Sequence, residues 1–112
     1  MFEKSADIRG KVVKLKELVE YQKGSVVSRT VIDKNAGTVT LFAFDEGEGL
    51  SEHTAPFDAL VVDLEGEVEV MIAGASNHLE EGDMIIMPAN QPHALKAISS
   101  LKMLLVMIKA TQ

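Results

Sequence analysis

The chain alternates between short apolar segments and turn signals about every ten residues, and this spacing is its most restrictive feature. The apolar segments are rich in Val, Ile, Thr, Leu and Phe, whereas Gly, Asn, Asp or Pro lies between them. The predicted strands include 25–33, 38–45, 59–64, 67–72, 84–87, 93–98 and 102–109. No helix-length periodic segment separates them, which disfavours a parallel α/β fold. The pattern predicts an all-β sandwich or barrel of roughly nine strands.

The N-terminal part of the chain departs from this pattern. Val12-Val13 is predicted as a short strand. A helical turn is predicted through Leu15, Leu18 and Val19, because their spacing places them on one helix face. A hairpin turn is predicted later in the chain, at residues 73–77.

Composition limits the class of protein. A length of 112 residues with 46% apolar residues predicts one domain, residues 1–112, with one core. The absence of cysteine excludes disulfides and thiolate metal sites, and a net charge of −6 argues against nucleic-acid binding. Residues 1–7 lack the basic and apolar regions of a signal peptide, and no apolar run reaches membrane-spanning length. A cytoplasmic location is therefore expected.

Two segments, 47–66 and 82–97, each place one histidine at fixed distances from glycines and a proline. The first resembles the first motif of the cupin family: Gly47, His53 and Gly66 fall on its pattern. The position of the motif's second histidine is occupied by Ala55, and that of its glutamate by Ala59.

The second segment resembles the second cupin motif. Gly82, Pro88 and His93 match it, whereas Asn90 replaces the inner glycine and Ala97 the final asparagine. Asn is a suitable replacement for glycine at a turn because it also tolerates the left-handed backbone region.

The resemblance covers about residues 38–108 and implies a double-stranded β-helix, the jelly-roll barrel of cupins, with the motif histidines in the barrel mouth. In the family, three histidines and one glutamate usually hold a divalent metal. Only His53 and His93 remain here, so the implied metal (zinc, iron, manganese, nickel or copper) has two protein ligands or is absent.

Three interpretations of the two histidines stay open. They are relics of a metal site, hydrogen-bonded to each other, to water or to the backbone. They hold a metal whose shell water completes. Alternatively, they act without metal as a general base or ligand anchor.

Other polar residues near the motifs are poor replacements for the missing ligands. Strand alternation directs Asp58 and Glu52 away from the histidine face, and His78 is predicted to face solvent. Asp63 shares the face of Ala59, but four residues of strand place it about 13 Å away.

Methionine is a further candidate ligand. A thioether beside two imidazoles suits copper, although methionines in apolar strands more commonly belong to the core. The candidates are Met84, Met87, Met103 and Met107.

The resemblance also implies a small-molecule pocket at the barrel mouth. Alanine at two ligand positions leaves a roomier and more apolar cavity, which favours a small, partly apolar ligand. The predicted lining residues are His53, His93, Ala55, Phe57, Ala59, Leu95 and Ala97. Small cupins commonly pair through their sheets, and the strand Val26–Ile32 would otherwise leave an exposed edge, so a homodimer is expected.

Two functions follow from the resemblance, and the sequence leaves open whether the chain is an enzyme. The first is a small-molecule-binding cupin with a depleted or absent metal site. The alternative is a metal-dependent isomerase, lyase or dioxygenase of a small sugar or organic acid that uses His53 and His93. Nothing in the sequence favours a third function, a regulatory subunit that binds another protein.

Overall fold

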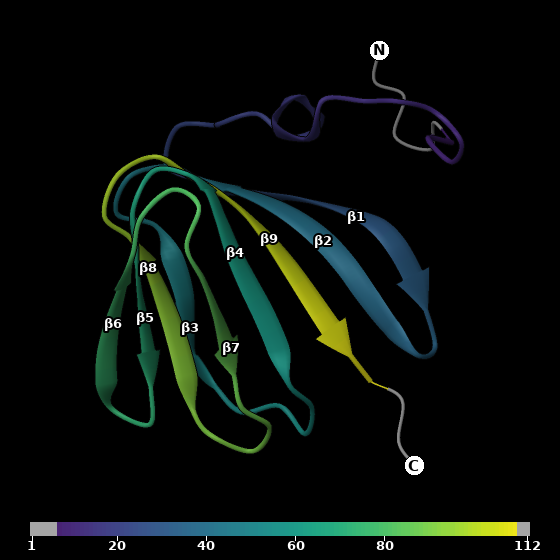
Figure 1. Cartoon of the computed structure of the whole chain (residues 1–112). Helices are drawn as coiled ribbons and strands as arrows, with labels where there is room; N and C mark the ends of the chain where they lie inside the picture. Colours follow the sequence, from purple (N-terminus) through teal and green to yellow (C-terminus); the bar gives the residue numbers. More distant parts are fainter. Residues whose placement is uncertain (1–6, 110–112) are drawn as a thin grey trace.

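The computed structural model describes residues 7–109, which form two antiparallel sheets facing each other and one short 3₁₀ helix, η1 (Leu15–Leu18) (Figure 1). The first sheet has five strands, in the order β1 (Val26–Lys34), β2 (Gly37–Phe44), β9 (Leu101–Ile108), β4 (Ala59–Glu65) and β7 (Met84–Met87). The second has four strands, in the order β3 (Gly49–His53), β8 (His93–Ala97), β5 (Val68–Ile72) and β6 (Ala75–Leu79). From β2 to β9 the chain passes repeatedly between the sheets, as in a jelly-roll barrel.

The main core lies between the two sheets, because alternate residues of each strand point inward. On β4, Ala59, Val61 and Asp63 are buried, and on β5, Val68 and Val70 are buried. These inward rows meet Phe44, Leu79, Met87, Leu95, Ala97, Leu101, Met103 and Leu105.

A second apolar cluster lies on the outer face of the five-stranded sheet. Leu41 and Ala43 of β2 are buried there beneath Val19, and Leu18 of η1 packs against them. The segment is fastened to the sheet by a hydrogen bond of 2.5 Å from the Tyr21 hydroxyl to the Glu65 carboxylate. The N-terminal segment thus covers part of the outer face.

Turn chemistry agrees with the motif positions. Gly66, between β4 and β5, has φ of 89°, and a Cβ there would collide with the carbonyl oxygen of Ser100. Asn90 has φ of 66°, the left-handed conformation expected where the family has glycine. Residues 20–24, which follow the buried Val19, and the hairpin turns lie at the surface.

The strand prediction is confirmed for the apolar segments but was wrong at three places. Val12-Val13 forms no strand, because these residues have no strand to pair with and remain exposed. β3 was not predicted, because Gly49–His53 is too polar to carry a strand signal of its own. It forms a strand because it pairs with β8. The 73–77 turn is confined to Ala73 and Gly74, both at positive φ, so β6 begins at Ala75.

Residues 1–6, on which the signal-peptide prediction depended, lie outside the described residues. Within residues 7–109 no helix is long and apolar enough to cross a membrane.

Candidate functional site

The two motif histidines meet at one end of the barrel. His53 ends β3 and His93 begins β8, and the two residues are direct partners in the β3–β8 register. Their Nε2 atoms are 3.1 Å apart, and the rings meet edge to face with centroids 4.3 Å apart. Strand pairing therefore brings together two side chains separated by forty residues in the chain.

The other nitrogen of each ring is held by a backbone carbonyl. His53 Nδ1 lies 3.0 Å from the Ser51 oxygen, and His93 Nδ1 lies 3.2 Å from the Gln91 oxygen. A carbonyl oxygen only accepts, so each Nδ1 carries the hydrogen and donates it. In two neutral imidazoles both Nε2 lone pairs then face each other. Two facing lone pairs repel each other unless a positively polarised group lies between them. That group is a shared proton, a hydrogen-bond donor of a ligand or a metal cation.

Burial of His93 reinforces this arrangement. Its side chain is part of the inner face, with 4% of the residue exposed, whereas His53 is exposed. Burial lowers the pKa of His93, the Gln91 carbonyl opposes that change and the nearby His53 adds to it. His93 is therefore held as a neutral imidazole with its Nε2 lone pair available.

The loops that carry the two motifs are joined beside the histidines. The Asp58 Oδ1 atom accepts a hydrogen bond of 2.8 Å from the Ala89 backbone N–H. The Asn90 N–H donates to the Ala55 carbonyl oxygen at 2.7 Å. These two contacts cross-link the first motif to the second. Asp58 is thus a positioning residue whose carboxylate is engaged by the second-motif loop.

The missing glutamate leaves an apolar position. Ala59 is buried, and its direct neighbours in the sheet are Met87 on β7 and Met107 on β9. Met87 and Met103 are buried and face the interior, whereas Met84 is exposed. The methyl group of Ala59, flanked by Met87 and Met107, therefore occupies the motif position where the family has a glutamate.

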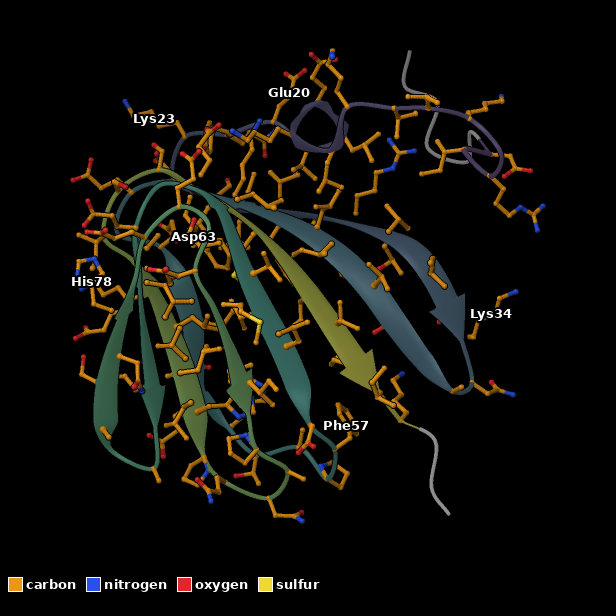
Figure 2. The ribbon with its side chains drawn as sticks, in the orientation of Figure 1. Glu20, Lys23, Lys34, Phe57, Asp63 and His78 are labelled. Atoms are coloured by element: carbon orange, nitrogen blue, oxygen red, sulfur yellow. The ribbon has the colours of Figure 1, made fainter. Side chains whose placement is uncertain are left out.

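The predicted pocket residues divide by burial. Ala59, Leu95 and Ala97 belong to the main core, whereas Ala55 and Phe57 are half-buried. Phe57 lies in the loop at the lower end of the barrel in Figure 2, whereas Asp63 lies at the opposite end. Their role as pocket lining stays a prediction.

One group of candidate ligands was missed from the sequence. His78 is exposed, as predicted, but the structure brings it together with Glu67 and Glu80. Asp63, predicted to be remote from the histidines, is fully buried near the end of β4. No local pattern marks either feature, because both depend on which strands pair.

Two facing antiparallel sheets with a motif histidine pair at one end define a jelly-roll barrel of the double-stranded β-helix type. The Cupin domain family model matches residues 40–109, and the chain belongs to the cupin family. No curated protein is significantly similar to it.

Solved structures agree with this assignment. A conserved protein of unknown function from Streptococcus pyogenes is 35% identical, with a TM-score of 0.88 over 93% of this chain and 91% of that one. A cupin superfamily protein from Desulfitobacterium hafniense is 25% identical, with a TM-score of 0.86 over 91% and 94%. A cupin 2 conserved barrel domain protein from Leptotrichia buccalis is 39% identical, with a TM-score of 0.81 over 84% of this chain and 46% of that chain.

The histidine pair fits part of the metal shell that cupins often have. Adjacent nitrogen ligands of a metal at about 2.1 Å lie about 3.0–3.4 Å apart, and the Nε2 atoms of His53 and His93 are 3.1 Å apart. Catalytic sites commonly take three protein ligands, and alanine occupies the other two motif positions, 55 and 59. The pair therefore fits two positions of a coordination shell and falls short of a full catalytic set.

Proposed function

We propose that this cupin binds a small molecule at the mouth of its barrel, with His53 and His93 as the polar anchor. The observation that carries the proposal is the convergence of two Nε2 lone pairs at 3.1 Å while both Nδ1 atoms donate to carbonyls. That arrangement is incomplete without an electron-accepting group between or beside the rings. Both histidines are held by the backbone, so the anchor is preorganised.

The surroundings of the anchor favour a small and partly apolar ligand. Ala55 and Ala59 replace two polar side chains of the family motif, and the strands flanking Ala59 present Met87 and Met107. Phe57 is half-buried at the rim and offers a ring face for stacking. Such a site combines apolar walls with few polar groups, as small-molecule sites usually do.

A metal ion in this site would be held by His53 and His93 alone, with water or the ligand completing its shell. When bound, the metal would act as a Lewis acid that polarises an oxygen of the ligand. With two protein ligands it is expected to be held weakly and to be lost during purification.

The metal content of the full-length chain, purified without a chelating column, tests this proposal. We expect less than one metal per chain. In a His78→Ala background, which disrupts the Glu67, His78 and Glu80 group, we expect weak binding of added Co²⁺ that His53→Ala and His93→Ala each abolish. Stoichiometric metal that survives dialysis against a chelator and disappears in either variant would overturn the depleted site. It would favour the alternative, a metal-dependent isomerase, lyase or dioxygenase.

Ligand-observed NMR tests the small molecule itself. We expect a panel of small sugars and organic acids to contain binders whose signal changes are lost in His93→Ala. Binding that persists unchanged in His93→Ala, or a panel without any binder, would contradict the proposed anchor.

We also propose that two copies of the chain pair through the outer face of the five-stranded sheet. Met84 and Ile86 of β7 point outward there and are each 52% exposed. Their direct neighbours on β4, Val62 and Leu60, are only half-buried. Two copies that pair through this face across a twofold axis would bury the same apolar side chains on both sides.

The N-terminal segment supports the same pairing. Val12 and Val13 are exposed on an extended stretch next to Lys11 and Lys14. A groove of about 660 Å³ lies between the N-terminal segment and β1. Its charged lining residues are Glu17, Glu20 and Arg29, so acidic side chains outnumber basic ones there. The basic and apolar stretch of one copy is complementary in charge to the groove of another.

Light scattering coupled to size-exclusion chromatography measures this pairing. We expect a dimer for the unaltered chain and a monomer for Ile86→Lys. Ile98→Lys is the matched control, because Ile98 is 46% exposed in the turn after β8, away from this face. A monomeric unaltered chain, or equal behaviour of both variants, would refute the interface.

A further inference from the structure

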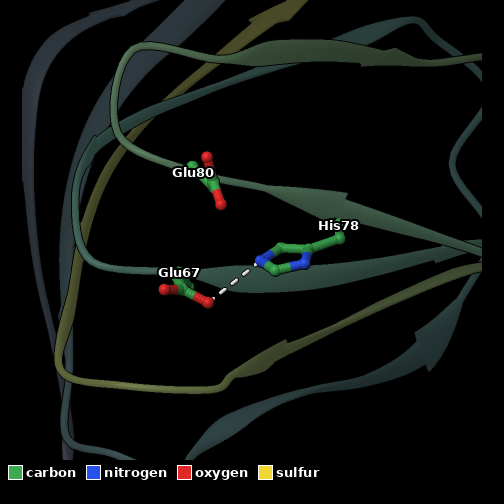
Figure 3. Close-up of side chains that lie close together, drawn as sticks. All are labelled: Glu67, His78 and Glu80. Atoms are coloured by element: carbon green, nitrogen blue, oxygen red, sulfur yellow. Dashed lines mark hydrogen bonds and ion pairs between the residues drawn. The ribbon is translucent and has the colours of Figure 1, made fainter.

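Three side chains, Glu67, His78 and Glu80, converge at one end of the β5–β6 hairpin (Figure 3). His93 pairs with Ile72, at the other end of β5 from Glu67. Val68 of β5 and Leu79 of β6 are direct partners, and both are buried in the core. Strand alternation therefore turns the residues before Val68 and on either side of Leu79 outward. The register of one hairpin thus places all three side chains on one surface.

The donor atoms of the three residues lie close enough to share one ion. His78 Nε2 lies 3.0 Å from a Glu67 carboxylate oxygen, and one ligand atom from each residue lies within 4.8 Å of the other two. Ligands of a tetrahedral metal at about 2.0 Å lie about 3.3 Å apart. His78 and Glu80 are exposed and Glu67 is half-buried, so small side-chain rotations would close the remaining gap.

The charge around these residues favours a cation. Glu67 and Glu80 bring two carboxylates together, and within residues 7–109 neither forms an ion pair with Lys or Arg. A hydrogen bond between His78 and Glu67 accounts for two of the three side chains, but it leaves Glu80 beside a second carboxylate without a counter-charge.

The buried carboxylate of Asp63 adds to the negative charge near Glu67. Asp63 is 1% exposed, and neither of its carboxylate oxygens has a hydrogen-bond partner. The charged side chains that act on it are Asp83, Glu81 and Glu67, all acidic. This end of the barrel therefore holds an excess of negative charge, including a carboxylate without polar partners, that a divalent cation at Glu67 would offset.

We propose that Glu67, His78 and Glu80 form a second, surface metal site for a divalent transition-metal ion of the zinc type. One imidazole and two carboxylates are a donor set that suits zinc, and the imidazole disfavours magnesium and calcium. Two carboxylates and a neutral imidazole also balance the charge of the ion. β6 is one of the two edge strands of its sheet, and His78 and Glu80 are exposed, so solvent reaches the remaining coordination positions. The ion would link β6 to the turn that precedes β5.

Zinc binding to the full-length chain tests this site in the background His53→Ala with His93→Ala, which removes the anchor at the mouth. Isothermal titration with Zn²⁺ is expected to show one site per chain, and His78→Ala is expected to weaken it by about tenfold or more. Zn²⁺ should also raise the melting temperature, and the rise should disappear with His78→Ala. His78 is exposed, whereas His93 is buried, so the His53→Ala/His93→Ala background is the reference and any loss of stability from removing His93 is common to it and to the triple variant with His78→Ala.

Matched controls separate ligation from general surface charge. Glu80→Gln removes a proposed ligand, whereas Glu81→Gln removes the same charge one residue further along the chain. We expect the first to weaken Zn²⁺ binding and the second to leave it within about twofold. Equal effects of the two, or unchanged binding in His78→Ala, would overturn the surface site. Because the background variants lack the mouth anchor, that result would leave the small-molecule proposal untouched.

Discussion

The Asp58 carboxylate accepts a hydrogen bond of 2.8 Å from the Ala89 backbone N–H, so a side chain of the first motif holds the loop of the second. Together with the bond from the Asn90 N–H to the Ala55 carbonyl, it positions the strand ends that carry the two histidines. The anchor geometry therefore depends on a residue that does not itself contact the pair.

Asp58→Ala is expected to lower the free energy of unfolding by about 1–2 kcal/mol, because the Ala89 N–H loses a charged acceptor. Urea denaturation measures that loss, and Co²⁺ titration in a His78→Ala background measures the accompanying decrease in affinity at the mouth. Asp58→Asn keeps an acceptor oxygen and serves as the control. If Asp58→Asn and Asp58→Ala behave alike in both measurements, the hydrogen bond is not what positions the loop.

Asp63 is expected to make the stability of the protein depend on pH. Burial raises the pKa of this carboxyl to about 6 from its ordinary value of 3.8, and acidic neighbours contribute to the rise. The Glu65 backbone N–H opposes it in part without forming a full hydrogen bond. Since the unfolded chain loses its proton first, stability should fall as pH rises from about 4 to about 6 and stay lower above that range.

Asp63→Asn tests this dependence. The variant should gain up to about 3 kcal/mol in the free energy of unfolding relative to the unaltered chain between pH 4 and pH 8, because it has no carboxyl to ionise. Urea denaturation at both pH values measures the difference, with Asp33→Asn in the exposed β1 hairpin as control. A difference between variant and unaltered chain that is the same at both pH values would show that Asp63 does not titrate as inferred.

Gly66→Ala is expected to destabilise the protein more than Gly74→Ala. Both glycines have positive φ, 89° and 85°, so both substitutions incur the cost of a left-handed conformation, about 1–2 kcal/mol. Only at Gly66 would the added Cβ also strike a backbone atom, the Ser100 carbonyl oxygen, whereas no atom lies within 4 Å at Gly74. Thermal denaturation should show a further loss of at least about 1 kcal/mol for Gly66→Ala. Equal losses would mean that the Ser100 turn moves away freely.

Restoring the family ligands should create tighter metal binding at the mouth. Ala55→His with Ala59→Glu supplies two more donors, so Co²⁺ affinity should rise by about tenfold or more in a His78→Ala background. Without metal the double variant should be less stable, because Ala59 is buried between Met87 and Met107. Adding His53→Ala should reverse the gain in affinity. Affinity that does not change would mean that the motif alignment across residues 53–66 is wrong.

Much of the fold could be predicted because the apolar strands carry their own signal. Segments such as Met84–Met87 and Leu101–Ile108 are apolar and bounded by turn residues, and their predicted positions agree with the structure. β3 and β6 escaped prediction because they are polar edge strands whose conformation depends on their partners, β8 and β5. The strand prediction at Val12-Val13 was wrong because these two β-branched residues have a strand-like sequence but no partner strand, so they stay irregular.

The candidate site was predicted in part. The motif spacing identified His53 and His93 and the alanines at 55 and 59, but not the backbone carbonyls that turn both Nε2 lone pairs toward each other. The convergence of Glu67 with His78 and Glu80 was also not predicted from the sequence, because it follows from the register of the β5–β6 hairpin.

The strand pattern of the sequence alone was enough to predict an all-β fold and its turns, because turn chemistry and strand alternation act over a few neighbouring residues. The motif resemblance then implied the cupin barrel and pointed to His53 and His93. The meeting of His53 with His93, the lack of a hydrogen-bond partner for the buried Asp63 carboxylate and the carboxylates around His78 follow from the three-dimensional arrangement. Each of these depends on atoms that strand pairing brings together from distant parts of the chain, and that pairing is a property of the whole barrel.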